Sequence, residues 1–513
     1  MDFRAEPSNG EMTIEEILRG LDVKKVKGPL DKEIKGIAYD SRVVKDGCLF
    51  VAVRGFSKDG HTYIKDAVNR GAVGVVAEKT LEVQNDITFI EVCDSRKALS
   101  FLSAVFYEEP SKELSLVGIT GTNGKTTTSY IIRSILKAWG KKVGLLGTIN
   151  YVIDKKVLKA SNTTPESLDL QGYLREMVDA GVEYALLEVS SHALSLRRVE
   201  NCTFKVAVFT NFSQDHLDFH GTMEEYFRAK TGLFGYLGKD DFAVLNRDDP
   251  MVRSLAEDLD CNLITCGLQE GTTLRAGNIS GMHNAGVRGR LTFDIHTPGG
   301  TLAMDSGLIG RNNVYNILMS VGVAYALGVS TDAIVKGVSE ARPVEGRFEK
   351  IDEGQEFLSI IDYAHTEDAL QNLIKDARLI TKGDIITVFG CGGDRDRTKR
   401  PEMGSVATEL SDFVIITTDN PRTERPEDII RGIVEGTRKN NFSVQPDRAR
   451  AITEAVSMAK RGDTVLIAGK GHEDYQEIDG IRHPFSDKEV VIKAIKNAKK
   501  KGFKGPRGQG AKG

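Results

Sequence analysis

The stretch that decides the fold is LSLVGITGTNGKTTTSYIIRSIL, residues 114–136. It opens with an apolar run, passes through GTNGKTT at residues 121–127, and ends with Ile131, Ile132, Ile135 and Leu136 spaced along one face of a helix. A buried strand, a glycine loop and a helix in this order are the context that a phosphate-binding loop requires. The sequence therefore predicts an α/β domain built around a nucleotide.

Each part of this loop suits a bound triphosphate. Gly121 and Gly124 let backbone N–H groups approach phosphate oxygens, and the helix N-terminus adds a favourable dipole. We expect Lys125 to neutralise β- and γ-phosphate charge and the Thr126 hydroxyl to reach Mg²⁺. Only two residues separate the glycines, whereas the common Walker pattern has four. A plain glycine turn is the alternative, and the complete string in its strand–helix context favours the phosphate site.

Buried-strand runs recur on both sides of the loop. Between residues 113 and 345 they are LSLVGIT, VGLLGT, EYALLEV, KVAVFTNF and DFAVLN, which predicts a mostly parallel sheet covered by helices. A polar, glycine-rich insert at about 268–305 is predicted as a strand-and-turn excursion. From residue 346 the alternation restarts with FLSIIDYAH, DIITVFG, DFVIITTDN and DTVLIAG. Each run ends in a polar or glycine-rich cluster, where doubly wound sheets bind ligands.

The flanking regions complete a three-domain α/β prediction. Residues 1–112 form a small mixed domain with the short runs GCLFVAV, AVGVVAE and ITFIEV. The central ATP-binding domain spans 113–345, and a Rossmann-like domain spans 346–497. Residues 498–513 are a basic tail that we expect to be disordered and solvated. Polyanion binding by this tail is the alternative.

Composition narrows the classes of function. A chain of 513 residues that is 40% hydrophobic and 28% charged is typical of a soluble globular protein of about three domains. Its net charge of -4 gives no field that favours nucleic acid or membrane. The six cysteines form no CxxC pair, no apolar run could span a bilayer, and the polar N-terminus is unlike a signal peptide. We therefore expect a cytoplasmic protein without nucleic-acid or membrane partners.

Further strings follow GTNGKTT in one order along the chain. They are NTTP (162–165), EVSSHAL (188–194), TNFSQDHLDFHG (210–221), AK (229–230), GRFE (346–349), DYAHT (362–366), GCGGDRDRTKRPEMG (390–404), DNPR (419–422) and GKGHEDYQ (469–476). Together they resemble the Mur ligase family over almost the whole chain. That family has a UDP-binding N-terminal domain, a central ATPase domain and a Rossmann-like C-terminal domain, which fits the three predicted regions.

The resemblance implies ATP and Mg²⁺ as cofactors and names the catalytic residues. Lys125, Glu188, His216 and Lys230 are implied in catalysis. Thr126, Glu188, His216 and Lys230 are implied as metal ligands, the lysine as an N-carboxylated side chain. From residue type alone, Lys230 in EEYFRAKTGLF would be solvated, Glu188 a solvated strand end, and His216 structural. Carbamate formation requires a neutral amine, so Lys230 needs a lowered pKa. The implied ATP-binding residues are Gly121, Thr122, Asn123, Gly124, Lys125, Thr126, Thr127 and Asn313.

The resemblance also implies a site for UDP-N-acetylmuramoyl-L-Ala-D-Glu, because hydroxyl and guanidinium groups suit carboxylate and sugar oxygens. NTTP taken alone fits an ordinary turn equally well. Leu196 stands where relatives can carry a glutamine, and Asn312 replaces a usual phenylalanine. Neither departure touches the phosphates. The implied residues are Tyr39, Ser41, Asn162, Thr163, Thr164, Ser190 and Arg198, with Phe56, Ser57 and Lys58 as further neighbours.

Two arginines favour meso-diaminopimelate as the amino acid. Arg422 in DNPR and Arg395 in GGDR can each hold a carboxylate with paired hydrogen bonds. Diaminopimelate differs from lysine by one extra carboxylate, so lysine would leave such an arginine unpaired. Lysine-adding relatives typically lack the DNPR arginine. A turn with a surface salt bridge is the alternative for this string. The implied set is Arg395, Asp419, Asn420, Pro421, Arg422, Gly469 and Glu473.

The implied reaction is an ADP-forming amide ligation in peptidoglycan precursor synthesis, by a monomer. ATP phosphorylates the D-glutamate γ-carboxylate, and an amine of diaminopimelate displaces phosphate from the acyl phosphate. One alternative is the same ligation with L-lysine or another diamino acid. A folylpolyglutamate synthase is disfavoured by NTTP, DHLDFHG and DNPR. A non-catalytic nucleotide-binding scaffold is disfavoured by the intact set of catalytic residues.

Overall fold

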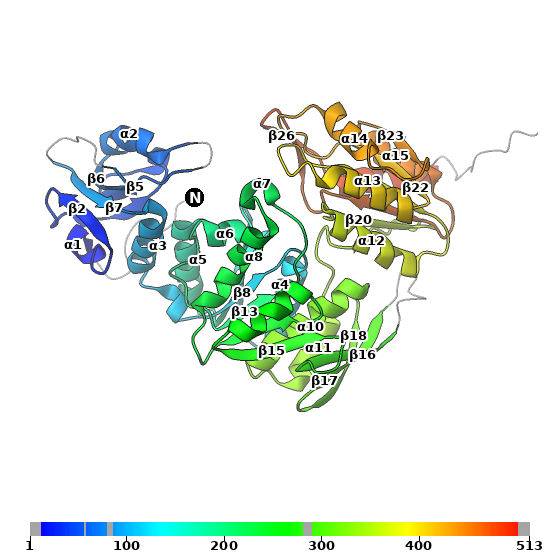
Figure 1. Ribbon diagram of the computed structural model, residues 1–513, viewed down its shortest axis with the longest axis horizontal. Coiled ribbons are helices and arrows are strands. Elements are labelled where there is room, and N and C mark those ends of the chain that lie inside the picture. The colour runs from blue at the N-terminus through cyan, green and yellow to red at the C-terminus, as the bar shows by residue number, and fades with distance from the viewer. Residues whose placement is uncertain (1–11, 56–57, 80–85, 281–289, 501–513) are drawn as a thin grey trace, which may run out of the picture.

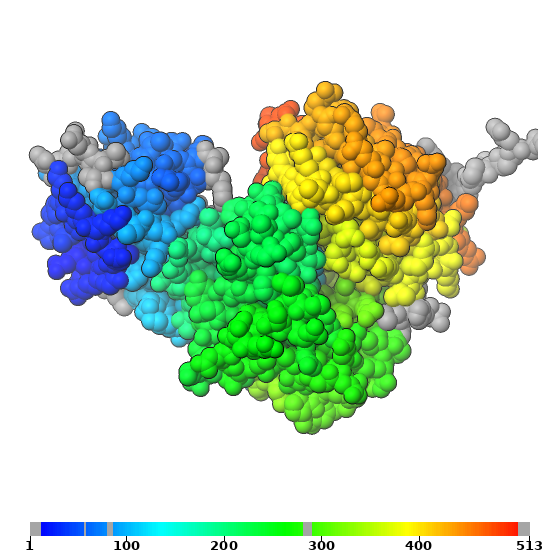
Figure 2. All heavy atoms as spheres, in the orientation of Figure 1, coloured from blue at the N-terminus to red at the C-terminus, as the bar shows by residue number. Residues whose placement is uncertain are grey.

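A computed structural model describes residues 12–55, 58–79, 86–280 and 290–500. Three α/β domains follow one another along the chain, and the central one lies between the other two (Figure 1). In the space-filling view the N-terminal and C-terminal domains stand apart above the central domain (Figure 2). The predicted α/β class with three domains is confirmed. Phe56, Ser57 and tail residues 501–513, which carry sequence-based predictions, lie outside the described residues.

The N-terminal domain is a five-stranded sheet with helices on its faces. Its elements are β1 (Met12–Thr13), α1 (Ile14–Ile17), β2 (Val23–Lys27), β3 (Glu33–Ile34), β4 (Gly36–Ala38), η1 (Ser41–Val43), β5 (Cys48–Val51), η2 (Gly60–Tyr63), α2 (Ile64–Asn69), β6 (Ala72–Ala77), β7 (Thr88–Val92), α3 (Ser95–Phe106) and η3 (Pro110–Lys112). The strand order is β2-β7-β6-β5-β4, parallel except for β2. Asp94 caps α3 by accepting from the backbone N–H groups of Arg96 and Lys97.

The central domain holds an eleven-stranded sheet. Its strands are β8 (Ser115–Thr120), β9 (Val143–Leu146), β10 (Asn150–Ile153), β11 (Lys156–Lys159), β12 (Tyr184–Glu188), β13 (Val206–Phe209), β14 (Phe242–Asn246), β15 (Asn262–Gly267), β16 (Leu274–Ser280), β17 (Leu291–Thr297) and β18 (Gly300–Ser306). The order is β11-β10-β9-β12-β8-β13-β14-β15-β16-β17-β18, and the run from β9 to β16 is parallel. The predicted glycine-rich excursion extends this sheet through antiparallel β17 and β18.

Helices cover both faces of the central sheet, which explains why its strands are continuously apolar. They are α4 (Lys125–Ala138), α5 (Ser167–Asp179), α6 (Ser191–Ser195), α7 (Leu217–His220), α8 (Met223–Thr231), η4 (Gly232–Tyr236), α9 (Pro250–Ser254), η5 (Leu255–Asp258), α10 (Arg311–Ala326) and α11 (Thr331–Glu340). The predicted apolar face of α4 is buried against α10 and α11. Helix α11 packs so closely that a Cβ on Gly337 would lie 2.3 Å from the Ile135 Cα atom.

The C-terminal domain is a six-stranded, doubly wound sheet. Its elements are β19 (Glu349–Lys350), β20 (Leu358–Asp362), α12 (Glu367–Ile380), β21 (Ile385–Phe389), α13 (Lys399–Leu410), β22 (Phe413–Ile416), α14 (Pro426–Val434), β23 (Phe442–Val444), α15 (Arg448–Met458), β24 (Thr464–Ala468), β25 (Tyr475–Ile478), β26 (Ile481–Pro484) and α16 (Asp487–Lys500). The order is β19-β20-β24-β21-β22-β23, antiparallel only at β19. One core lies under α12, α13 and α14, and a second lies under α15 and α16.

The structure also describes the C-terminal helix and the cysteines. Helix α16 continues to Lys500, three residues into the segment that the sequence predicts as a tail. The apolar side of α16 packs Val491 and Ile495 into the core. All six cysteines are free. None of the helices in the described ranges is both long and apolar enough for a membrane span.

Candidate active site

The phosphate loop lies between the end of β8 and the start of α4, and its glycines are required by the backbone. Gly121 and Gly124 have φ angles of +138° and +85°. A Cβ on Gly121 would lie 2.0 Å from the Thr210 hydroxyl oxygen, and one on Gly124 would lie 2.5 Å from Oδ1 of Asn316. Only glycine combines these φ angles with such close approaches. The glycine spacing in the sequence therefore has a direct structural cause.

Two lysines converge on this loop, the half-buried Lys125 and the buried Lys230. The ammonium groups of Lys125 and Lys230 each donate to the Gly121 carbonyl oxygen at 2.8 Å. Lys230 is only 1% exposed and lies 4.5 Å from the ring centroid of Tyr226. Burial, followed by the charge of Lys125, holds the pKa of Lys230 well below its usual range. The solvated lysine suggested by residue type alone is wrong, and the surroundings favour a neutral amine.

Glu188 ends β12 and is fully buried beside the loop. Its Oε2 accepts hydrogen bonds from the hydroxyls of Thr126 and Thr148, both at 2.8 Å, and its Oε1 accepts from the Thr148 N–H at 3.1 Å. A Cβ on Gly147 would lie 2.2 Å from Oε1, so the neighbouring backbone is close as well. The carboxylate is thus aimed at the first turn of α4, and the alternative of a solvated strand end is wrong.

His216 stands at the start of α7 with a φ of +55°. Its ring packs edge-on against His192, with the centroids 4.7 Å apart. Burial lowers the pKa of His216 to about 3, so its imidazole is neutral and retains a lone pair. A neutral imidazole of this kind can serve as a ligand.

Asp215 joins the central domain to the C-terminal domain. Its carboxylate lies 3.5 Å from Nε2 of His365, 3.4 Å from Nε2 of His216, and 3.9 Å from Nζ of Lys399. Burial alone would raise the pKa of Asp215, but the His365 hydrogen bond and the positive charge of Lys399 hold it well below its usual range. The sequence did not identify Asp215 as a site residue. It belongs to the DHLD string, but its partners come from strings far along the chain.

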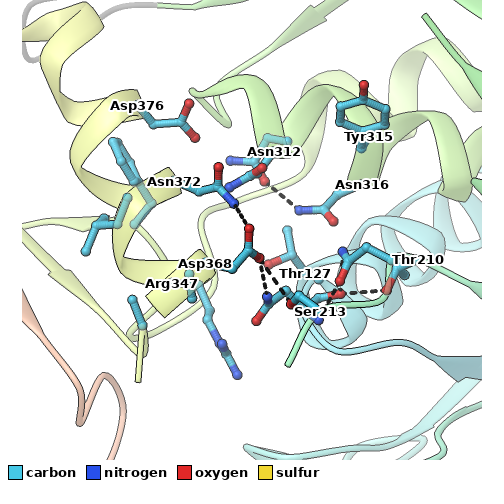
Figure 3. Close-up of a pocket in the computed structure, with 18 of the residues that line it drawn as sticks. Thr127, Thr210, Ser213, Asn312, Tyr315, Asn316, Arg347, Asp368, Asn372 and Asp376 are labelled. Carbon is cyan, nitrogen blue, oxygen red and sulfur yellow. Dashed lines mark hydrogen bonds between the residues drawn. The ribbon is translucent and has the colours of Figure 1, made fainter. Parts of the chain in front are cut away.

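A cavity of about 270 Å³ lies between the phosphate loop, α10 and α12. Figure 3 shows Asp368, Asn372 and Asp376 on α12 facing Asn316 across it. Asp368 accepts from the Asn123 side-chain amide at 3.1 Å, so the two domains close the cavity together. Polar and aromatic side chains elsewhere in its wall include Thr127, Thr210, Asn211, Ser213, Asn246, Asp249, Asn312, Asn313, Tyr315, Arg347 and Tyr363.

Asn313, which the resemblance implies in ATP binding, lines this cavity, and two hydrogen bonds hold its side chain. It donates to the Ile309 carbonyl at 2.7 Å and accepts from the Asn316 amide at 3.1 Å. Asn312, the departure from the family pattern, lies in the same wall. Arg347 of the GRFE string also lines the cavity, with its guanidinium 4.6 Å from the Tyr363 ring centroid. Sequence patterns marked that string but could not assign Arg347 a position.

A second cavity, of about 160 Å³, gathers the residues predicted for the amino acid. They come from the carboxyl ends of β21, β22 and β24, where parallel sheets bind ligands. Arg395, Asp419, Asn420, Arg422, Gly469 and Glu473 line the cavity together with Asp215 and His216. Pro421 is absent from the wall, and its carbonyl oxygen faces Gly393. Tyr363 lines both cavities, which are therefore adjacent.

The DNPR loop is held from inside the cavity and is not a surface turn. Arg422 has a φ of +51°, and its Nη1 donates to the Gly393 carbonyl at 2.6 Å. Its side chain is only 19% exposed, and its Nε lies 3.8 Å from the Glu477 carboxylate. Nη1 of Arg395 donates to the carbonyl of Asp394 at 2.9 Å. A weak ion pair and single backbone contacts leave both guanidinium forks with capacity for a ligand carboxylate.

Two further basic residues lie behind the wall of this cavity, and the sequence did not single them out. Lys470 is fully buried and donates to Glu473 at 2.9 Å and to the Asn420 side chain at 3.0 Å. Arg448, also fully buried, pairs with Asp487 through two contacts of 2.7 Å. Its guanidinium also donates to the carbonyl of Thr418, in the loop after β22, at 3.4 Å, and to the carbonyl of Ala468, the last residue of β24, at 2.9 Å. Arg448 therefore ties together the loops that carry Asp419 and Gly469.

Residues predicted for the UDP-linked substrate fall into two groups. Thr164 donates to the Glu188 carbonyl at 2.7 Å and accepts from the Ser190 N–H at 3.1 Å. Arg198 donates to the Thr164 carbonyl at 3.0 Å, and the Thr163 hydroxyl lies 3.2 Å from that of Thr148. This first group adjoins Glu188.

The second group is on the N-terminal domain. The Tyr39 hydroxyl donates to Asp169 of α5 at 2.7 Å, and the burial of this tyrosine raises its pKa. Ser41 is buried at the start of η1, and Lys58 is exposed. Asn162 belongs to neither group: it is exposed on the central domain between β11 and α5, and its backbone is bonded to the Tyr151 hydroxyl at 2.6 and 3.1 Å. Leu196 follows α6 and is partly exposed.

Comparisons with known proteins agree with this arrangement. The description "Mur ligase family, catalytic domain" matches residues 33–107, "Mur ligase middle domain" matches 119–324, and "Mur ligase, glutamate ligase domain" matches 346–471. The chain is 44% identical over 480 residues to the UDP-N-acetylmuramoyl-L-alanyl-D-glutamate--2,6-diaminopimelate ligase of Bacillus licheniformis, covering 92% of this chain and 97% of that one. It is 43% identical over 514 residues to the ligase of the same name from Geobacter metallireducens, covering 96% and 100%.

Solved structures share the architecture. A structure of UDP-N-acetylmuramoyl-L-alanyl-D-glutamate--2,6-diaminopimelate ligase superposes with a TM-score of 0.67 at 32% identity, covering 96% of this chain and 100% of that one. The MurF ligase from Thermotoga maritima in complex with ADP superposes with a TM-score of 0.61 at 21% identity, covering 91% and 97%. The second likeness concerns the fold alone.

Proposed function

The chain belongs to the Mur ligase family, and we propose that it joins meso-2,6-diaminopimelate to UDP-N-acetylmuramoyl-L-Ala-D-Glu in an ATP-dependent, ADP-forming step of peptidoglycan precursor synthesis. One observation carries this proposal. The cavity that holds Arg395, Arg422 and Glu473 also opens onto His216, and it adjoins the cavity at the phosphate loop through Tyr363. An amino acid and a nucleotide bound there would meet at one point.

The phosphate loop would bind the triphosphate of ATP. Loop N–H groups and the N-terminus of α4 face the phosphates. The Lys125 ammonium, which now donates to the carbonyls of Gly121 and Thr122 at 2.8 and 2.9 Å, would turn to phosphate oxygens. Because Lys125 is half-buried, water would screen its charge less than at an open surface, and the charge would stabilise the transferring phosphoryl group. Asn313 and its neighbours would line the nucleotide pocket.

The residues beside the loop fit a hard divalent cation. The set predicted from the sequence offers the Glu188 carboxylate, the Thr126 hydroxyl and the neutral imidazole of His216. Among the described residues no group of three or more His, Cys, Asp or Glu side chains is arranged to hold a metal. A carbamate on Lys230 would add the missing anionic ligand, and the lowered pKa of this lysine supports its formation. Bound Mg²⁺ would offset phosphate charge during transfer.

The amino-acid cavity would fix diaminopimelate by its far end. Arg422 and Arg395 would pair with the distal carboxylate, and Glu473 with the distal ammonium. Lys470 and Asn420 both donate to Oε2 of Glu473, which leaves Oε1 for the ligand. The other amine would then be free to attack the acyl phosphate formed on the D-glutamate γ-carboxylate. Loss of phosphate from the tetrahedral intermediate leaves the amide.

Contacts across the two domains would exclude water from the acyl phosphate. Asp215 reaches His365 and Lys399, while Asn123 reaches Asp368. The UDP-linked substrate would enter from the side of Thr164, Ser190 and Arg198. We expect the enzyme to work as a cytoplasmic monomer without nucleic-acid or membrane partners, because its proposed substrates are small and soluble.

The decisive experiment is amino-acid-dependent phosphate release. Purified protein is given ATP, Mg²⁺ and UDP-N-acetylmuramoyl-L-Ala-D-Glu, with meso-diaminopimelate or L-lysine in parallel. We expect turnover with diaminopimelate, little with lysine, and ADP plus phosphate as products. A preference for lysine would keep the ligation and overturn the assigned role of the arginines. Formation of AMP and pyrophosphate would reject the acyl-phosphate route.

A further inference from the structure

A third cavity, of about 1110 Å³, lies along α4 beyond the phosphate loop and shares no residue with the two cavities described above. We call it the linker groove, because residues 341–345, which connect α11 to the C-terminal domain, form one side. Helix α4 forms the opposite side with Tyr130, Arg133, Ser134 and Lys137. The remaining side chains that the argument uses are Ile149, Asn150, Arg290, Lys336, Ser339 and Arg342.

The linker groove is positively charged in a protein whose net charge is -4. Its wall carries five cationic side chains and two anionic ones, Glu340 and Glu345. Glu345 lies 3.7 Å from Lys488 on α16, so its charge is partly compensated outside the groove. Arg290 pairs with Asp305 at 2.5 Å. The excess positive charge therefore rests on the four other cations.

These four cations are Arg133, Lys137, Lys336 and Arg342. Across the described part of the chain, none of them has a carboxylate within ion-pairing distance. The Nε of Arg133 is buried and donates to no acceptor. The charge of Arg133 is the main cause of a lowered pKa at Lys137, one helical turn away. Arg133 is half-buried and Lys137, Lys336 and Arg342 are exposed. The buried Nε–H of Arg133 therefore carries the cost of a missing acceptor, and an anion bound in the groove would remove that cost.

We propose that the linker groove binds a small organic anion through a diphosphate group. Two guanidinium forks and two ammonium groups match the several oxygens and the roughly three negative charges of a diphosphate near neutral pH. A single carboxylate would leave most of these cations unpaired. Tyr130, Ile149 and the Pro343 ring provide an apolar wall for the organic part, and Asn150 and Ser339 provide polar contacts. The diphosphate can be free pyrophosphate or the end of a nucleotide.

Occupancy of the groove has a consequence for the ligase site. Helix α4 carries Lys125 at its first position and Arg133 and Lys137 in its second half. The linker carries Arg342 and continues into Arg347, which lines the nucleotide cavity. A diphosphate bridging α4 and the linker would restrict the movement of the C-terminal domain relative to the phosphate loop. It would therefore change the KM for ATP in the proposed ligation.

The test is calorimetric binding to the full-length protein with its phosphate loop saturated by ADP and Mg²⁺. The probes are inorganic pyrophosphate and, separately, cytidine diphosphate. We compare wild type with the double variant R133Q/K137Q, which lies outside the ligase machinery. The matched control is K24Q/K25Q, which removes the same charge from two exposed lysines of β2. We expect R133Q/K137Q to weaken binding of at least one probe tenfold or more, while K24Q/K25Q leaves it unchanged.

Each outcome is informative. If R133Q/K137Q weakens the binding of both probes, the groove recognises the diphosphate itself. If it weakens the binding of cytidine diphosphate alone, recognition also requires the nucleoside. The proposal would be overturned if wild type bound neither probe, or if wild type and R133Q/K137Q bound the probes with equal affinity. It would also be overturned if K24Q/K25Q weakened binding as much as R133Q/K137Q does. Ligase activity without added pyrophosphate should be retained in R133Q/K137Q. If that variant fails to fold, K336Q/R342Q on the opposite wall makes the same test.

Discussion

The phosphate loop and the amino-acid cavity both lie at the carboxyl ends of parallel strands, yet they are built in different ways. The loop consists of consecutive residues, 121–127, and its shape comes from the backbone. The cavity combines the ends of β21, β22 and β24 with residues of the central domain. A site formed by backbone groups depends on a few glycines, and it binds the nucleotide in the same way whichever amino acid is the acceptor. A site made of distant side chains depends on packing and selects the acceptor.

This difference also appears in how each site is supported. In the loop, Gly121 and Gly124 sit against Thr210 and Asn316, so the local backbone and its immediate neighbours define the geometry. In the cavity, Arg448 and Lys470 are fully buried behind the ligand-facing groups and hold two loops in place. Changes at the loop should therefore reduce catalysis with every amino acid. Changes in the cavity should alter the choice of amino acid and leave ATP binding intact.

The largest effect is expected for Lys230→Ala. Removal of the proposed metal-binding carbamate should lower kcat by about 10³-fold with every amino acid, since a lost electrostatic contact to the transition state has costs of this order. Steady-state kinetics measures the loss. Labelling with ¹³C-bicarbonate should show a carbamate signal in wild type and none in the variant. Arg228→Ala, an exposed change on the same helix, is the control. Turnover near the wild-type rate would contradict the assigned role.

Gly121→Ala should come next. Its Cβ would meet the Thr210 hydroxyl at 2.0 Å, so the loop must move away from the phosphates. We expect ATP affinity to fall by roughly 10²-fold, which corresponds to about 2.7 kcal/mol. Calorimetric titration with ATP measures this. Gly140→Ala is a matched control, because Gly140 also has a positive φ, of +81°, but has no atom within 4 Å of the added Cβ. Equal loss of affinity in both variants would reject the steric explanation.

Arg422→Gln should separate the two sites. Loss of one charge-assisted pair with a carboxylate costs about 1.5–3 kcal/mol, so the KM for diaminopimelate should rise by roughly 10- to 100-fold. The KM for ATP should stay within about twofold, because Arg422 lines the amino-acid cavity and does not line the nucleotide cavity. Arg425→Gln, which removes an exposed arginine three residues later, is the control. A matching rise in the KM for ATP would show that the two sites are not independent.

The smallest effect concerns Asp376, where the two domains meet at the nucleotide cavity. Burial raises the pKa of this carboxyl to about 6, although it accepts from the Arg311 N–H at 3.0 Å. A raised carboxyl pKa means that the ionised form destabilises the fold above about pH 6, and this penalty disappears as the pH falls below the ordinary value near 4. Asp376→Asn should therefore raise stability at about pH 8 by on the order of 1–2 kcal/mol.

Thermal unfolding at about pH 5 and pH 8 tests this prediction. The difference in Tm between Asp376→Asn and wild type should be larger at the higher pH. Asp332→Asn, on the exposed first turn of α11, should show no such dependence. A stabilisation that is the same at both pH values, or a destabilisation at pH 8, would contradict the proposed cost of the buried charge.

Some features followed directly from the order of residues. Residues 114–136 predicted the strand, loop and helix around the nucleotide, because a buried strand is continuously apolar and a helix repeats every three to four residues. The motif strings predicted the family, and the family supplied the set of candidate site residues. The buried face of α4 and the doubly wound C-terminal sheet were confirmed on the same basis.

Other features needed the tertiary structure, because they depend on groups far apart in sequence. The burial of Lys230, the contacts of Asp215 with His365 and Lys399, and the support of the cavity by Arg448 have no local signature. The linker groove likewise combines α4, α11 and the linker. Periodicity reports which face of an element is buried, whereas desolvation and charge pairing depend on what is packed against that face. The sequence alone therefore determined the fold and the family, and packing decided the protonation and positions of the groups at the site.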